Sequence, residues 1–336
     1  MLELVEVFYM NLKDIANLAN VSVSTVSKAF SGSREISDKT KKHIFEIARE
    51  KGCFDRYNKN KFDKKLVAVI VPEVNSDYYY RIVLELDREI TRQGGVLLTS
   101  ISNFSEDKTA ELFSYYSEYC KVDGIVIIDD IGKVKNPLYI PTVAMCTHKK
   151  IKNIDTMCPN IQPALNQAIL HLRNLGHTKI GFVGEKLTTG RLNNFKEAMT
   201  QAGAVLNPEY IKISNKRFEE AGFEIAEEMI AKNNLPSAII AAYDYIAIGF
   251  IKALRKHGYQ VPQDVSVIGI DDIGLSKYLE TSLSSISINN TKYCRLITDM
   301  LFKKMKNQYI MFNKNDMEIN AELKIRDSIG PPKKTD

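Results

Sequence analysis

The chain has 336 residues, of which 44% are hydrophobic, and its 46 Lys and Arg exceed its 41 Asp and Glu. This composition is ordinary for a globular protein of two or three domains. No apolar run approaches the roughly 18–20 residues that span a bilayer. The first ten residues lack the Lys or Arg that a secretory signal would carry. We therefore expect a cytoplasmic protein that does not contact a membrane.

Reactive and metal-binding residue types form no recognisable site in the sequence. The five cysteines are scattered, odd in number and never in Cys-x-x-Cys spacing, and no histidine pair has metal-ligand spacing. The glycine motifs of phosphate-binding loops, dinucleotide-binding folds and nucleophile elbows are absent as well. We expect no cofactor, no bound metal and no enzymatic activity.

The net charge of +5 is unevenly distributed along the chain. Residues 11–65 carry 13 Lys and Arg against 7 Asp and Glu, so the rest of the chain is nearly neutral. This asymmetry is typical of a phosphate-binding module joined to a neutral body. A solvated basic surface is the alternative interpretation.

The first elements along the chain are three short helices. Leu12, Ile15, Ala16 and Ala19 share one helical face, and Ser22 can cap a second helix, Val23–Phe30. Ser37 can cap a third helix, Asp38–Lys51. Two short helices joined by a three-residue turn and braced by a third indicate a helix-turn-helix module.

The second helix is polar on its outer side, where Ser24, Thr25, Ser27 and Lys28 lie. Hydroxyls and a cation are the groups that bond phosphates and base edges. The helix therefore predicts DNA recognition. A small helical domain with a polar surface is the alternative interpretation.

From Leu66 onward strands and helices alternate, which predicts doubly wound parallel sheets. Two such sets predict two lobes, with a ligand in the crevice at the carboxyl ends of the strands. The expected strands are 66–72, 96–101, 124–129, 142–146, 179–184, 210–214, 238–242 and 265–271, and the expected helices are 78–94, 105–119, 163–175, 192–202, 218–232 and 245–257.

The beginning of the chain resembles the DNA-binding headpiece of the lactose/galactose repressor (LacI/GalR) family. The resemblance lies in Leu-Lys-Asp-Ile-Ala at 12–16, Ala-Asn-Val-Ser-Val-Ser-Thr-Val-Ser-Lys at 19–28 and Ile-Ser-Asp-Lys-Thr-Lys-Lys at 36–42. Three residues depart from the family pattern: Asn20 replaces the usual Gly, Lys28 replaces Arg, and Ser31 replaces Asn.

The resemblance continues to about Arg326. Matching segments are Leu-Gly-His-Thr-Lys-Ile at 175–180, Gly-Arg-Leu at 190–192, Tyr-Asp-Tyr-Ile-Ala-Ile-Gly at 243–249 and Pro-Gln-Asp-Val-Ser-Val-Ile-Gly-Ile-Asp-Asp at 262–272. It implies a small all-α helix-turn-helix domain followed by a two-lobed α/β, periplasmic-binding-protein-like domain. The implied domains are a headpiece at 10–53, a hinge at 54–65 and an effector-binding and dimerisation domain at 66–327. In that last domain, lobe 1 comprises about 66–160 plus 290–318. Lobe 2 comprises about 161–289 plus 319–327.

The resemblance also implies DNA contacts. Val23, Ser24 and Lys28 would read bases, because an apolar side chain suits a thymine methyl and a cation suits a guanine edge. The linker lacks the family's Pro-Asn and hinge leucine, and Phe62 is its only obvious apolar wedge for the minor groove. A hinge helix and a solvated linker both remain open there. The other expected DNA-binding residues, mostly phosphate contacts, are Lys13, Ser22, Thr25, Ser27, Ser31, Ser37 and Thr40.

The expected effector site follows from the same resemblance. Arg191 would offer a fork of donors, and Asp271 would accept from two hydroxyls; surface salt bridges are the alternative for both. Tyr79 would stack on a ring, and Tyr243 stands where the family commonly has Asn. Asp129 or Asp130, at the end of a strand, contributes a contact or belongs to a solvated loop. Asp244 is expected to be a structural cap of its helix, with ligand contact as the alternative.

We therefore expect a repressor that binds a pseudo-palindromic operator in double-stranded DNA. By resemblance it is a homodimer whose DNA affinity is controlled by a small molecule, a sugar or sugar derivative, between the lobes. The tail after Arg326 contains no leucine heptad, so we expect a dimer and not a tetramer. The alternative is a free-standing cytoplasmic solute-binding protein without DNA-binding activity.

Overall fold

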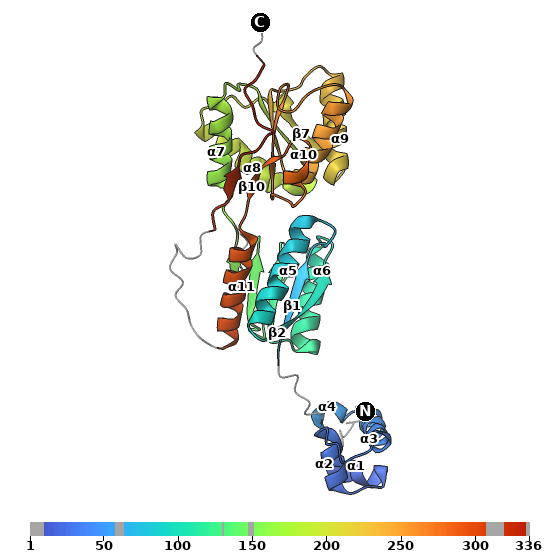
Figure 1. The fold of residues 1–336 in the computed structure, drawn as a ribbon. Coiled ribbons are helices and arrows are strands. Elements are labelled where there is room, and N and C mark those ends of the chain that lie inside the picture. Colours follow the sequence, from blue (N-terminus) through green and yellow to red (C-terminus); the bar gives the residue numbers. More distant parts are fainter. Residues whose placement is uncertain (1–9, 58–63, 130, 147–150, 307–318, 334–336) are drawn as a thin grey trace, which may run out of the picture. The chain divides into compact units, whose positions relative to one another are not determined.

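The computed structural model describes residues 10–57, 64–129, 131–146, 151–306 and 319–333 of the chain (Figure 1). It divides into two compact units, Met1–Lys65 and Leu66–Asp336. Neither contains a helix that combines the length and apolarity needed to cross a bilayer, as far as the described residues extend.

The first unit is helical, with α1 (Leu12–Ala19), α2 (Val23–Phe30), α3 (Asp38–Glu50) and α4 (Phe54–Tyr57). Helix α1 contains the four residues predicted to share a helical face, α2 has the predicted bounds, and α3 ends one residue earlier than expected. Side-chain caps define where these helices begin. Asn11 and Asp14 form a capping box on α1, while Ser22 and Ser37 accept hydrogen bonds from the backbone N–H groups of Thr25 and Thr40.

One side of each helix forms the core of the first unit. Ile15, Val26, Phe30 and Ile44 are fully buried or nearly so, at 0–4% exposure. Helix α4 covers one side of this core. The ring centroids of its Phe54 and Tyr57 each lie 5.8 Å from that of Phe30. Phe54 and Tyr57 of the expected hinge therefore pack on the headpiece. Residues 58–63, which include Phe62, lie outside the described residues.

The second unit contains two sheets, and the first defines lobe 1. Its strand order is β2-β1-β3-β4-β5, and every strand pair whose register is determined is parallel. Its helices are α5, α6 and α11, and a π-helical turn, Tyr115–Cys120, follows α6. The bounds are β1 Lys65–Val71, β2 Gly95–Ile101, β3 Gly124–Ile128, β4 Thr142–Met145, β5 Asp155–Met157, α5 Asp77–Arg92, α6 Glu106–Ser114 and α11 Asn290–Met305.

Alternation along β1 shows why this sheet is covered on both faces. Val67, Val69 and Val71 belong to the cluster that includes α5 and α11, whereas Ala68 and Ile70 belong to the cluster that includes the end of α6. Successive strand side chains point to opposite faces, so a continuous apolar run implies burial on both sides.

The second sheet defines lobe 2, with strand order β11-β10-β9-β8-β6-β7. All its pairs are parallel except β10 with β11. Figure 1 shows its helices on both sides of the sheet. The bounds are β6 Ile180–Glu185, β7 Ile211–Ser214, β8 Ala238–Ala241, β9 Ser266–Ile270, β10 Ser284–Ser287, β11 Glu322–Lys324, α7 Gln162–Asn174, α8 Thr189–Gln201, α9 Phe218–Ala231 and α10 Asp244–Lys256.

The expected strands and helices of the second unit are present with shifts of a few residues at their ends. The sequence did not predict β5, β10, α11 or β11. Helix α11 returns the chain to lobe 1, where it packs against α5, β3 and β4. The bridge between Asn160 and Asn320 then pairs two distant segments near the junction of the lobes.

Candidate functional site

A cavity of about 470 Å³ lies in the second unit, and both lobes contribute to its wall. Lobe 1 supplies residues that follow β1 and β3, and lobe 2 supplies residues at the ends of β6, β8 and β9. These are carboxyl ends of parallel strands, where α/β proteins generally bind ligands. All five effector residues expected from the sequence, Tyr79, Asp129, Arg191, Tyr243 and Asp271, line this one cavity.

Arg191 and Asp271 form a bidentate ion pair. Arg191 Nη2 donates to Asp271 Oδ1 at 2.7 Å, and Nη1 donates to Oδ2 at 3.1 Å. Nη1 also donates to the carbonyl of Ala242 at 2.6 Å. Burial disfavours the charged guanidinium, but Asp271 outweighs burial and raises the pKa of Arg191. The two residues therefore form a salt bridge inside the cavity, not on the surface.

Arg217 is a second cavity arginine, and sequence reasoning missed it. It donates to both carboxylate oxygens of Glu73, at 2.7 and 3.0 Å, and its Nε donates to Glu185 at 3.2 Å. Glu73 follows β1, Glu185 ends β6, and Arg217 follows β7. Charged residues that end a strand or follow it within three positions, at the carboxyl ends of β1, β6 and β7, are the signal that could have drawn attention to these residues.

Tyr243 takes part in the same cluster. Its hydroxyl donates to Glu185 Oε1 at 2.8 Å and accepts from the backbone N–H of Phe218 at 3.1 Å. Burial is the main cause that raises the pKa of this phenol. Tyr243, which stands where the family commonly has Asn, is thus hydrogen-bonded to protein groups at the cavity wall.

The lobe 1 wall is aromatic and acidic. The Tyr79 hydroxyl donates to Asp129 Oδ2 at 3.4 Å, and the Tyr79 ring meets Phe104 edge-on with centroids 6.1 Å apart. Tyr78 shares a hydrogen bond with Cys146 Sγ at 3.2 Å. Burial raises the pKa of Tyr79, so this hydroxyl keeps its proton and remains a donor. Asp130, the alternative to Asp129, lies outside the described residues.

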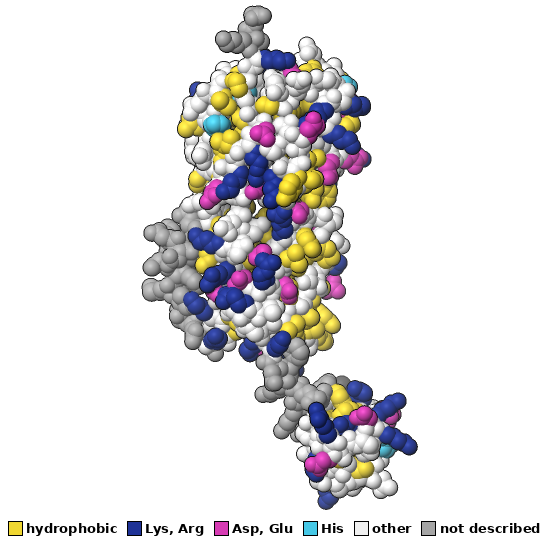
Figure 2. Space-filling view, in the orientation of Figure 1, with side chains coloured by type: hydrophobic (Ala, Val, Ile, Leu, Met, Phe, Trp, Pro, Cys, Tyr) yellow, Lys and Arg dark blue, Asp and Glu magenta, His cyan; other side chains and the backbone are white. Residues whose placement is uncertain are grey.

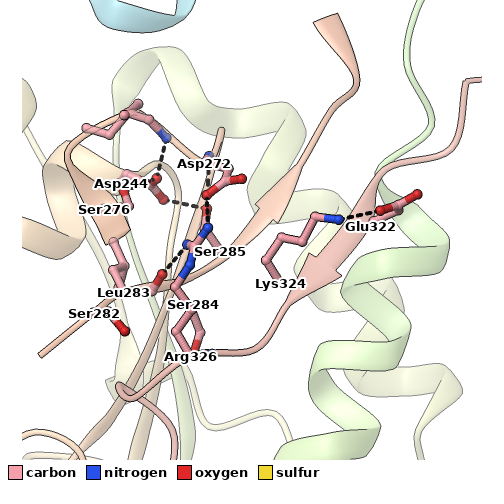
Figure 3. A network of polar contacts seen from close by, with 12 residues as sticks. Asp244, Asp272, Ser276, Ser282, Leu283, Ser284, Ser285, Glu322, Lys324 and Arg326 are labelled. Atoms are coloured by element: carbon pink, nitrogen blue, oxygen red, sulfur yellow. Dashed lines mark hydrogen bonds and ion pairs between the residues drawn. The ribbon is translucent and has the colours of Figure 1, made fainter. Parts of the chain in front are cut away.

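Asp244 does not cap its own helix, contrary to our expectation. It is the first residue of α10, and the cap position, Tyr243, makes no side-chain cap bond. Figure 3 shows instead that the Asp244 carboxylate reaches the segments after β9 and in β10. It accepts from Ile273 N at 2.9 Å and from the hydroxyls of Ser276 and Ser285, each at 2.6 Å. Burial raises the pKa of Asp244 to about 7.

The polar side of α2 is exposed, as the sequence predicts. Val23 has 43% exposure, and Ser24, Ser27 and Lys28 are exposed beside it. Lys28 forms an ion pair with Glu35. Figure 2 shows Lys and Arg side chains on the visible face of the first unit. The other expected DNA-binding residues that the structure describes are exposed (Lys13, Ser22, Ser31, Ser37) or partly exposed (Thr25, Thr40).

Asn20, at the place where the family has Gly, ends α1 in the left-handed conformation, with φ 53° and ψ 47°. Among residues other than Gly, Asn tolerates this region best. The departure at this position is therefore conservative for the backbone of the turn between α1 and α2.

Comparison with known proteins agrees with both units. The profile of bacterial regulatory proteins of the lacI family matches residues 11–52, and that of the periplasmic binding protein-like domain matches residues 169–329. This combination defines a helix-turn-helix regulator with a periplasmic-binding-protein-like body. These matches confirm the resemblance to the LacI family and the fold class inferred from the sequence.

Curated relatives extend over nearly the whole chain. The ribose operon repressor of Haemophilus influenzae is 27% identical over 308 residues, covering 88% of this chain and 92% of its own. The transcriptional repressor PurR of Mannheimia succiniciproducens is 26% identical over 333 residues, covering 95% and 98%.

Solved structures share the fold. The Escherichia coli repressor AscG is 25% identical with a TM-score of 0.68, covering 80% of this chain and all of that one. The lac repressor dimer bound to operator and an anti-inducer is 18% identical with a TM-score of 0.69, covering 96% and 99%.

Proposed function

We propose that this chain is a cytoplasmic transcriptional repressor, without catalytic activity, whose affinity for double-stranded operator DNA is controlled by a small carbohydrate or carbohydrate derivative. One observation carries the proposal. Five residues spread from Tyr79 to Asp271, expected from the sequence to hold an effector, line one cavity in a chain that begins with a helix-turn-helix unit. DNA recognition and ligand recognition are thus assigned to separate units.

The arrangement of α2 supports the DNA-binding role. Its buried side holds it against α1 and α3, so Val23, Ser24 and Lys28 are presented from a fixed helix. The exposed hydroxyls of Ser22 and Ser37 lie at the first turns of α2 and α3, where free N–H groups also favour a phosphate. In this proposal the hydroxyls set the register on the DNA, and α2 reads the bases in the major groove.

The cavity supports the effector role. Its volume of about 470 Å³ lies within the range of roughly 300–1,000 Å³ typical of small-molecule sites. Because both lobes contribute contacts, a ligand can favour one arrangement of the lobes over another. A ligand acts on DNA affinity only through such a difference in its affinity for two states.

We also propose that the repressor is a homodimer on a pseudo-palindromic operator. Tyr80 and Leu84 are 51% and 44% exposed one turn apart on α5, an apolar pair suited to an interface in lobe 1. A related structure, the lac repressor, is a dimer bound to operator. Leu84→Asp should convert the dimer to a monomer and so halve its molecular mass in analytical ultracentrifugation. The control is Leu170→Asp, at an exposed position of α7 in lobe 2, which should leave the molecular mass unchanged.

A mobility-shift assay with DNA upstream of the protein's own gene tests the proposed regulator. We expect specific binding that weakens steeply as salt rises, because phosphate contacts release counterions. A protein that binds sugars but no such fragment at any salt concentration would instead be a solute-binding protein, and the repressor proposal would fail.

A further inference from the structure

The charged groups of the cavity are unbalanced. Among the described residues, four carboxylates line it against two guanidinium groups, and no lysine. Setting Asp129 aside leaves three carboxylates against two guanidiniums, so the imbalance does not depend on that residue. Asp244 is not counted, because three protein donors already bind its oxygens. The counted residues are Glu73, Asp129, Glu185 and Asp271 against Arg191 and Arg217.

Both guanidinium groups already have carboxylate partners. Arg191 is engaged by both oxygens of Asp271 and by the carbonyl of Ala242. Arg217 is engaged by both oxygens of Glu73 and by Glu185. Bidentate pairs of this kind are strong, and an anionic ligand would have to displace one of them. Neither arginine is therefore poised to receive a phosphate or a carboxylate.

The other polar groups are arranged to favour donors on the ligand. The hydroxyls of Tyr243 and Tyr79 donate their protons to Glu185 and Asp129, so the acidic side chains remain the main acceptors of the wall. Each carboxylate has more acceptor sites than a single hydrogen bond fills. Ligand hydroxyl or ammonium groups can use the remaining sites.

Aromatic rings complete the wall. Phe218 meets the rings of Tyr243 and Tyr245 edge-on, with centroids 6.0 and 5.6 Å apart. The rings of Phe218 and Tyr245 also line the cavity, together with Phe104. Aromatic faces accept apolar C–H surfaces, and they attract cations through the ring quadrupole while offering anions nothing comparable.

We propose that the cavity selects an uncharged or cationic polyhydroxylated ligand, a neutral sugar or an amino sugar, and rejects phosphorylated and carboxylated sugars. This inference rests on the proposed function and specifies its effector. The physical reason is that an added anionic group would enter a site whose described lining already holds excess negative charge and offers no unmatched cation to receive it.

The test uses the full chain and matched sets of probes. Each set contains a neutral sugar, its amino derivative where one exists, its phosphate and its uronic acid, for example glucose, glucosamine, glucose 6-phosphate and glucuronate. Thermal shift finds the active sets, and calorimetry measures dissociation constants. In the active sets we expect the anionic members to bind at least about tenfold more weakly than the neutral or amino member.

An anionic member that binds as tightly as its neutral parent would overturn the inference. So would the absence of binding by every neutral and amino member. Operator binding by the same preparation separates that second outcome from failure of the repressor proposal, because the mobility shift does not require a ligand of this class.

A charge variant tests the cause. Glu73→Gln keeps the side-chain shape but removes one carboxylate charge and leaves Arg217 less neutralised. We expect the affinity of the anionic member relative to the neutral member to rise about fivefold or more. The control Glu228→Gln also breaks ion pairs, with Lys212 and Lys232, but lies outside the cavity. The proposed charge selection would be contradicted if this relative affinity were unchanged in Glu73→Gln, or if it rose equally in both variants.

Discussion

Arg217 of lobe 2 donates two hydrogen bonds to Glu73 of lobe 1, at 2.7 and 3.0 Å, beside the ligand cavity. The same guanidinium holds Glu185 at the end of β6. The guanidinium carbon Cζ of Arg217 also lies 5.1 Å from the ring centroid of Phe104, a residue of lobe 1. Arg217 is thus one of the side chains that link the two lobes, as is Arg81, which donates to the carbonyl of Asp272. Any movement between the lobes must change the contacts of Arg217.

Replacing Arg217 should weaken the second unit. Arg217→Met keeps an aliphatic stem but leaves Glu73 and Glu185 without their shared cation. We expect unfolding free energy to fall by about 1–3 kcal/mol, between the values for exposed and fully buried pairs. Scanning calorimetry measures the change. Lys216→Met, which breaks the exposed neighbouring pair with Glu220, should have almost no effect, so equal losses in both variants would argue against the fastening role.

Replacing Arg191 should remove the response to effector. In Arg191→Ala the bidentate pair with Asp271 is lost, and the donors expected to orient a ligand are lost with it. We expect no ligand-induced thermal shift, while operator binding in a mobility-shift assay persists because the first unit is unaltered. Arg255→Ala, which breaks an exposed pair with Glu280, is the matched control. A normal ligand shift in Arg191→Ala would mean that the effector binds elsewhere.

Asp244 should make stability depend on pH. Burial raises its pKa from 3.8 to about 7 in the folded protein, so the unfolded chain loses this proton at lower pH than the folded one. Between about pH 4 and 7 the folded state therefore holds more protons, and the stability contributed by this group falls as pH rises. Asp244→Asn should remove this pH dependence, so that the free energy of unfolding declines by up to about 4 kcal/mol less across this range. Urea unfolding across this pH range measures it, and an unaltered profile would contradict the buried titration.

Asp264 provides a control of opposite sign. Burial is the largest single effect and raises its pKa, but the hydrogen bonds from Lys333 and Gln260 N–H and the charge of Lys333 together outweigh it, so the net shift is downward. Its contribution is present at neutral pH and is lost as pH falls through the lowered pKa. Asp264→Asn should therefore cost stability near neutral pH and leave the decline attributed to Asp244 in place.

Two lysines of the first unit should affect DNA binding differently. Lys28→Ala should weaken binding to the operator by about 1–3 kcal/mol and relax sequence preference, because Lys28 lies on the exposed side of α2. Lys13→Ala should weaken binding to all sequences alike and lower the salt slope by about 1, as loss of a phosphate contact does. Mobility shifts on operator and scrambled DNA at several salt concentrations distinguish them. Identical behaviour of the two variants would refute the assigned roles.

Local patterns determined the first unit and most of the regular elements. Apolar residues three and four apart, together with the caps Ser22 and Ser37, were enough to place α1, α2 and the start of α3, because these signals act within one or two turns. The family motifs likewise identified Arg191 and Asp271 as partners of one site, although nothing in their spacing shows the bidentate pair.

Elements that depend on the tertiary environment were missed. Strand β10 reads Ser-Ser-Ile-Ser, which has no apolar run, and it is buried because its hydroxyls find partners such as Asp244 and Arg326 N. Strand β11 forms only by pairing antiparallel with β10. Buried polar groups need hydrogen bonds, and those bonds come from residues 41 and 42 positions away.

The sequence by itself thus determined the family, the helix-turn-helix unit with its exposed reading helix, and the residues expected at the effector site. Only the tertiary structure decided how that site is charged. Glu73, Glu185 and Arg217 are separated by up to 144 residues and meet because parallel strands bring their carboxyl ends to one cavity. Ion pairing at such separations depends on the packing of two sheets, which no local pattern encodes.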